Sequence, residues 1–120
     1  MSQASGTETA PVPVLRCGPC ALPRMALMQD VRSLMLQYLR RQSTSYADFI
    51  DVWNQLDFGM IHYACQDAAL PGRRVFLEFL YRQVLSYLLV SHSVQAKVGV
   101  IYALHCLFHS QPPSLPHVRV

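Results

Sequence analysis

The segment Tyr46–Ile61, which contains the only tryptophan of the chain, places the tightest constraint on the fold. Its apolar residues recur at the i, i+3, i+4 and i+7 spacing of one helical face, and they are Phe49, Val52, Trp53 and Leu56. Ser45, with an acid three residues later, is typical of a helix start, and the run 57–59, Asp-Phe-Gly, indicates a corner. We therefore predict a short amphipathic helix that packs on a larger surface and then turns.

The composition predicts one domain that is unusually apolar. With 120 residues, the chain is long enough for one domain and too short for two ordinary ones. Apolar residues make up 52% of the chain and charged residues only 14%, against about a quarter charged in a typical soluble domain. We therefore expect part of the surface to contact another protein.

The charge and the cysteines exclude some classes of function. The net charge of +3 comes from ten basic and seven acidic residues that are scattered, so charge alone predicts no polyanionic partner. No secretory signal pattern begins the chain, which favours a reducing compartment and free thiols. The four cysteines are Cys17, Cys20, Cys65 and Cys106.

Residues 1–24 are predicted to be a disordered extension, because they are rich in Ser, Thr, Gly and Pro and lack periodicity. Within them, Cys17-Gly18-Pro19-Cys20 matches a thioredoxin-type redox centre, which needs a preceding strand and a following helix in a parallel α/β unit. No strand pattern precedes the motif, and no strand–helix alternation follows it. A chance pair in a flexible arm is therefore favoured over a redox role.

The rest of the chain predicts helices. Arg24–Gln42 carries one apolar stripe, Val75–Val90 is apolar almost all round, and Val94–Phe108 is similar, with Ser93 as its N-cap. The tight connection at residues 91–93 predicts that the last two helices pair antiparallel. Residues 60–65 are expected to be a short helix or an irregular crossover, and residues 67–72, which include a proline, a loop.

These elements predict an all-α domain, residues 25–110, of four to five helices packed as consecutive antiparallel hairpins. Residues 111–120 are expected to be a Pro-containing linker that begins a truncated further element. We expect Gly99 to lie where a neighbouring helix comes too close for a Cβ atom. The predicted structural core residues are Phe49, Trp53, Phe58, Gly59 and Gly99.

No set of residues predicts catalysis or a cofactor. His105 and His109 lie four apart on one helix beside Cys106, but a third ligand at a known zinc spacing is missing, so solvent-facing histidines are favoured over a metal site. No nucleophile motif, nucleotide-binding loop or small-molecule site is found. A membrane hairpin is disfavoured because Glu78 and Arg82 interrupt the first apolar helix.

Arg73 and Arg74 form a pair that breaks a local rule. Two cations at a helix start meet the positive end of the helix dipole, so we expect an outside group to compensate them. A DNA phosphate, an acidic partner segment and ordinary solvation as a loop pair all remain open. The surface candidates for partner binding are Arg73, Arg74, Lys97 and Tyr102.

Three groups of residues carry a family resemblance in their joint order. They are Tyr46-x-Asp48-Phe49-x-x-Val52-Trp53 with Phe58-Gly59-x-Ile61, then Val98-Gly99-x-x-Tyr102-x-Leu104, and last Val118-Arg119-Val120. In this order and spacing, the chain from about Leu27 onward resembles the N-terminal domain of subunit 1 of the small-nuclear-RNA-activating protein complex. Residues 1–24 have no counterpart in that pattern, and the family continues beyond it into further helices and a charged tail.

The resemblance implies a nuclear, non-catalytic scaffold subunit. Such complexes bind the proximal sequence element of small nuclear RNA promoters and serve RNA polymerases II and III. The implied partners are the largest, Myb-repeat subunit, subunit 3 and the TATA-binding protein, with promoter DNA contacted through the complex. A helical adaptor outside transcription is the alternative, since it would share every local feature and differ only in partner.

Overall fold

A computed structural model describes residues 15–17, 20–65 and 69–118 of the chain. The predicted all-α fold is confirmed for the described domain, which has a two-stranded hairpin in front of it. The elements in chain order are β2 (Leu15–Cys17), β3 (Cys20–Leu22), α1 (Arg24–Arg40), α2 (Tyr46–Gln55), the 3-10 helix η1 (Phe58–Ala64), α3 (Leu70–Leu85), α4 (Tyr87–Val90) and α5 (Val94–His109).

The hairpin lies inside the segment that the sequence predicted to be disordered. β2 and β3 pair antiparallel, with Cys17 opposite Cys20 in the register. The expectation that no strand precedes the cysteine pair is therefore wrong, since β2 ends at Cys17. An antiparallel hairpin is nevertheless not the parallel unit of a thioredoxin-type centre. The disorder expected for residues 1–14 lies outside the described residues.

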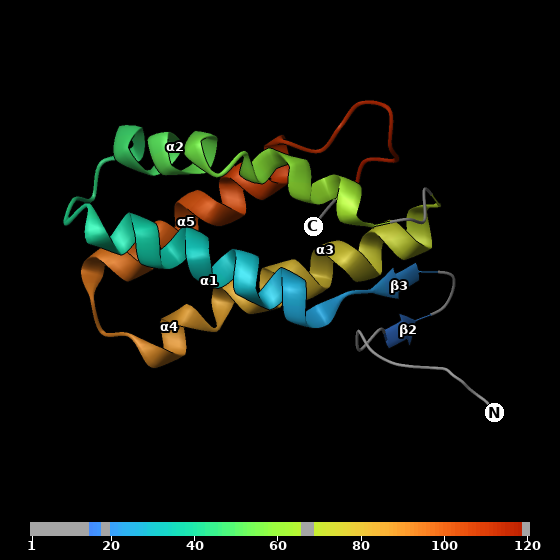
Figure 1. Ribbon diagram of the computed structural model, residues 1–120, viewed down its shortest axis with the longest axis horizontal. Coiled ribbons are helices and arrows are strands. Elements are labelled where there is room, and N and C mark those ends of the chain that lie inside the picture. The colour runs from blue at the N-terminus through green and yellow to red at the C-terminus, as the bar shows by residue number, and fades with distance from the viewer. Residues whose placement is uncertain (1–14, 18–19, 66–68, 119–120) are drawn as a thin grey trace.

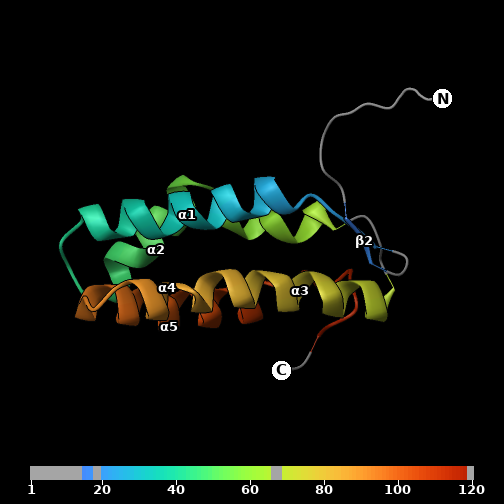
Figure 2. The same ribbon diagram turned by 90° about the horizontal axis from the view of Figure 1, so that it is seen from below.

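The helices form two layers of antiparallel pairs. In Figure 1 the chain runs along α1, returns through α2 and η1, runs back through α3 and α4 and returns along α5. Figure 2 shows α1 with α2 and η1 in one layer and α3 and α4 with α5 in the other. The last two helical segments, α3 with α4 and then α5, run antiparallel, which confirms the prediction. The physical reason is the connection at residues 91–93, which is only three residues long.

The predicted helix starts are confirmed, and the predicted corner at residues 57–59 is a break between two helices. The Ser45 hydroxyl accepts a hydrogen bond from the Asp48 backbone N–H at 3.4 Å, and the Ser93 hydroxyl accepts one from the Ala96 N–H at 3.2 Å. Each serine thereby satisfies an N–H that has no partner inside its helix. Asp57, in the left-handed region at φ 50°, separates α2 from η1, which continues in the same general direction along the domain (Figure 1).

The segment from residue 70 to residue 90 differs from the prediction in two ways. The predicted loop at residues 67–72 is wrong in its second half, because α3 begins at Leu70 and holds Pro71 in its first turn. A proline is tolerated there because first-turn N–H groups have no helical partner. The predicted single helix Val75–Val90 is also interrupted at Ser86, whose hydroxyl donates to the Gln83 carbonyl at 2.7 Å.

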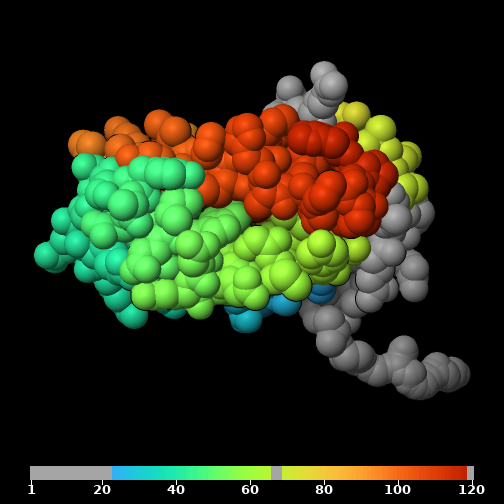
Figure 3. Space-filling model, turned by 90° about the horizontal axis from the view of Figure 1, so that it is seen from above, coloured from blue at the N-terminus to red at the C-terminus, as the bar shows by residue number. Residues whose placement is uncertain are grey.

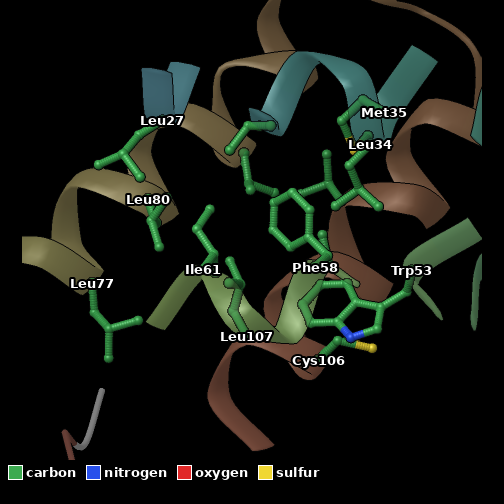
Figure 4. Close-up of a cluster of buried hydrophobic side chains, with 14 of the residues drawn as sticks. Leu27, Leu34, Met35, Trp53, Phe58, Ile61, Leu77, Leu80, Cys106 and Leu107 are labelled. Carbon is green, nitrogen blue, oxygen red and sulfur yellow. The ribbon is translucent and has the colours of Figure 1, made fainter. Parts of the chain in front are cut away.

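The core lies between the two layers and is contributed by every long helix. In Figure 4, Phe58 and Ile61 of η1 lie between side chains of α1, such as Leu34, and Leu107 of α5. The Trp53 ring lies 4.9 Å from the Phe58 ring, measured between centroids. The short η1 thus fills the space between α1 and α5 that α2 leaves uncovered.

Residues 111–118 fold back beside α5. Gln111 holds Val118 with both ends of its side-chain amide, donating to the Val118 carbonyl at 2.9 Å and accepting from its N–H at 2.8 Å. Pro112 and Val118 are buried. Figure 3 shows this segment, in red, on the same face as η1. Its role as a linker to a further element stays a prediction.

Candidate interaction surfaces

A buried polar pair lies between η1, α3 and the end of α5. Arg73 and His62 are both completely buried. One terminal nitrogen of the Arg73 guanidinium donates to the His62 carbonyl at 3.0 Å, and the other lies 3.2 Å from His62 Nδ1. His62 Nε2 lies 3.1 Å from the Leu107 carbonyl and 3.0 Å from Ser110 Oγ. The pair therefore links three segments that are distant in the sequence.

The geometry fixes the protonation state of His62. Because a guanidinium can only donate, His62 Nδ1 is the acceptor and Nε2 carries the proton that reaches the Leu107 carbonyl. Burial, together with the nearby Arg73 cation, lowers the pKa of His62 from 6.5 to about 4. The imidazole is neutral at physiological pH, and a neutral ring is what the Arg73 contact requires.

The structure separates the four residues predicted to bind a partner. The prediction that Arg73 is a surface residue is wrong: its guanidinium is buried, donates to the His62 acceptors and lies over the Phe76 ring, whose centroid is 5.4 Å from the guanidinium carbon, while its Nε atom has no hydrogen-bond partner among the described residues. Arg74 and Lys97 are exposed. Tyr102 is half-buried and donates its hydroxyl to the Thr44 carbonyl at 2.7 Å. The four residues do not form one site.

The residues predicted to be structural lie in or beside the core. Phe49, Trp53 and Phe58 are buried, and Gly59 is half-buried. Gly99 lies against α1, where an added Cβ atom would be 2.9 Å from Tyr38 Cδ2. Around this point four residues, Tyr38, Phe49, Gly99 and Tyr102, form what we call the aromatic crossing. Its ring centroids lie 5.2 Å apart for Tyr38–Phe49 and 5.6 Å apart for Phe49–Tyr102.

The two histidines considered as metal ligands lie on the surface. His105 and His109 are exposed and their ring centroids are 4.4 Å apart, while Tyr46 lies 6.1 Å from His105. Cys106 is buried and its sulfur is 3.6 Å from the Tyr46 hydroxyl. Among the described residues, no three His, Cys, Asp or Glu side chains gather where they could hold a metal ion.

One large exposed apolar surface lies where α3 ends. Residues 85–94, which we call the α4 corner, include Leu89 at 85% exposure, Val90 at 75% and Val94 at 69%. The helix α4 has no buried residue. A shallow groove of about 450 Å³ separates it from α1, where Met25 and Met28 are also exposed. Exposed apolar surface of this kind is typical of a protein contact.

A second groove lies on the other side of α1, against η1. It has a volume of about 460 Å³, and each wall carries one carboxylate, Asp30 from α1 and Asp57 from the residue that precedes η1. Met60 and Tyr63, both more than half exposed, lie along it. Sequence reasoning missed this groove because it treated residues 60–65 as a connection. The clue in the sequence is that residues 60–65 contain both Met60 and Tyr63, and so short a segment cannot bury both side chains.

None of the described helices has the length and apolar character that crossing a membrane requires. The structure combines the predicted all-helical domain with exposed apolar side chains at two grooves that flank α1. These features define an all-helical domain with exposed apolar grooves, and apolar surface of this kind is typical of protein contacts.

The comparison with protein families identifies the domain more narrowly. Residues 27–120 match the family described as small nuclear RNA activating complex (SNAPc), subunit 1. The chain therefore belongs to this family, whose members are subunits of a transcription complex, as the resemblance implied. No curated protein and no solved structure matches the chain.

Proposed function

We propose that the chain is a non-catalytic scaffold subunit of SNAPc in the nucleus. In this role it holds the largest, Myb-repeat subunit and meets subunit 3, within a complex that binds the proximal sequence element and recruits the TATA-binding protein. The complex then supports transcription of small nuclear RNA genes by RNA polymerases II and III. The observation that carries the proposal is the family match across residues 27–120, which spans every helix except the first three residues of α1.

The surface supports a scaffold more than a direct DNA contact. Its two grooves are lined mainly by apolar side chains, and one of them carries two carboxylates, which repel phosphate. Of the two arginines considered for phosphate contact, Arg73 is buried and only Arg74 is exposed. DNA contact is therefore assigned to the assembled complex and not to this chain alone.

The proposal is tested by affinity purification from nuclear extract with the full chain as bait, read by mass spectrometry. We expect recovery of the largest SNAPc subunit and subunit 3. The matched control is the Gly99→Leu variant, in which packing is disrupted, so that proteins recovered equally with both baits are nonspecific. Recovery of a different stable partner without any SNAPc subunit would support the helical adaptor outside transcription and overturn the proposal.

A further inference from the structure

We propose that the groove between α1 and η1 binds a basic amphipathic segment of a protein partner. The inference rests on the proposed function in taking a protein as the occupant, and goes beyond it in assigning the place and the chemistry. The groove is a hollow of about 460 Å³, a size that accommodates several apolar side chains. Its apolar lining comes from Leu56, Phe58, Met60, Ile61, Tyr63 and Ala64.

The carboxylates of the groove decide the charge of the occupant. Within the described part of the chain, the side chains of Asp30 and Asp57 make no hydrogen bond or ion pair, and described ion pairs are made by Arg41 with Asp48 and Asp51. Asp30 is exposed, but its carboxylate is partly desolvated by the groove, which raises its pKa, so a cation placed beside it would be favoured. A chain with a net charge of +3 thus presents two uncompensated acids on facing walls.

The apolar side chains of the groove decide that the occupant is also apolar. Met60 is 55% exposed and Tyr63 is 54% exposed, although both belong to a helix whose Phe58 and Ile61 are buried in the core. A 3-10 helix has three residues per turn, so its side chains at i and i+3 share a face, and Met60 and Tyr63 point together toward the groove. An occupant that covers them needs apolar residues at helical spacing, flanked by Lys or Arg.

Competing occupants fit less well. A nucleic acid backbone would bring phosphates against Asp30 and Asp57, which is unfavourable. An acidic amphipathic segment would face the same repulsion. The groove on the other side of α1 has the opposite character, since Arg32 lines it and it has no carboxylate in its lining. The two sides of α1 therefore select segments of different charge.

The test places a photo-crosslinker in the groove of the full chain. Tyr63→p-benzoylphenylalanine keeps an aromatic ring at the position, and crosslinked peptides from nuclear extract are sequenced by mass spectrometry. We expect the captured segment to carry apolar residues at i, i+3 or i+4 together with Lys or Arg. Capture of an acidic segment or of nucleic acid, or no capture at position 63, would overturn the inference.

Charge reversal supplies the second arm. Asp30→Lys with Asp57→Lys should reduce the crosslink by about fivefold or more, as expected for losing about 1 kcal/mol of ion pairing. The control is Glu78→Lys, which reverses a single acid at an exposed position of α3 outside the groove and is compared with each of the two single reversals, Asp30→Lys and Asp57→Lys. Circular dichroism checks the fold, and should the double reversal unfold the domain, Asp30→Asn with Asp57→Asn replaces it. An undiminished crosslink in a folded variant contradicts the inference.

The identity of the captured protein separates the two proposals. A basic amphipathic segment from a protein outside SNAPc leaves the groove assignment intact and counts against the proposed function. A SNAPc subunit captured through an acidic segment would overturn the groove assignment and support the proposed function.

Discussion

The aromatic crossing and the α4 corner are both rich in apolar side chains, yet those of the crossing are largely buried and those of the corner are exposed. At the crossing, the side chains of α1, α2 and α5 meet around Gly99, and Tyr38 and Phe49 are completely buried. At the α4 corner, Leu89 and Val90 are more than 70% exposed. Apolar composition therefore does not by itself mark the core: residues become core where helices from both layers converge.

The largest expected effect comes from filling the crossing. In the Gly99→Leu variant, the Cβ atom alone would lie 2.9 Å from Tyr38 Cδ2 and 3.2 Å from the Met35 methyl carbon, both on buried side chains. Overpacking of this kind costs about 1–3 kcal/mol, and the clash of a whole leucine places the loss at the upper end. Urea denaturation followed by tryptophan fluorescence measures it.

The control for the crossing is the other glycine near an aromatic side chain. At Gly59 an added Cβ atom would lie 3.7 Å from Trp53 Nε1, an ordinary contact, so Gly59→Ala should change stability by less than about 1 kcal/mol. Equal losses at the two glycines would mean that the crossing is not specially packed.

The second largest effect on stability is expected at the buried polar pair of His62 and Arg73, and it depends on pH. Because the pKa of His62 is lowered to about 4 in the folded state, the unfolded state binds a proton first as the pH falls below 6.5. Stability is therefore complete above pH 6.5 and is lost between about pH 6.5 and 4, with a slope of at most about 1.4 kcal/mol per pH unit for this one group.

Denaturation at several pH values, compared with the His62→Gln variant, isolates this residue. Glutamine keeps an acceptor for Arg73 and a donor for the Leu107 carbonyl, but it does not titrate, so its stability curve should be flatter over that range. The pKa of His62 can also be read directly by NMR. A value near 6.5 would show that the ring is not held neutral by its surroundings.

A smaller effect is expected at the rim of the crossing. Tyr102→Phe removes the hydrogen bond to the Thr44 carbonyl, 2.7 Å long, while it keeps the ring that packs on Tyr46 and Phe49. The expected loss is about 0.5–1.5 kcal/mol by urea denaturation. Tyr63→Phe, at an exposed position away from the crossing, is the control and should change little.

The smallest effect on stability, and the sharpest contrast, is expected at the α4 corner. Leu89→Glu places a charge on a side chain that is 85% exposed, so the free energy of unfolding should change by less than about 0.5 kcal/mol. Recovery of partner proteins from nuclear extract should nevertheless fall if the corner is a contact surface. A large loss of stability would show that the corner is part of the core.

The sequence predicted the parts of the fold that depend on local chemistry. The Ser45 and Ser93 caps follow from the spacing of serine before an apolar run, and the pairing of the last two helical segments follows from a connection too short to cross the domain. It misjudged the start of α3, because Pro71 can indicate either a loop or the first turn of a helix. It also misjudged Arg73, because whether a cation is buried depends on which acceptors other segments bring to it.

The sequence alone determined some properties of this protein, and the tertiary structure determined others. The order of helices, their caps and the family were available from the chain itself, since periodicity and residue order are properties of neighbouring positions. Only the tertiary structure decided that His62 and Arg73 meet inside the domain, that the two glycines differ in their surroundings, and that Asp30 and Asp57 face one groove. The physical reason is that burial and electrostatic environment depend on residues distant in the sequence, whose approach no local pattern specifies.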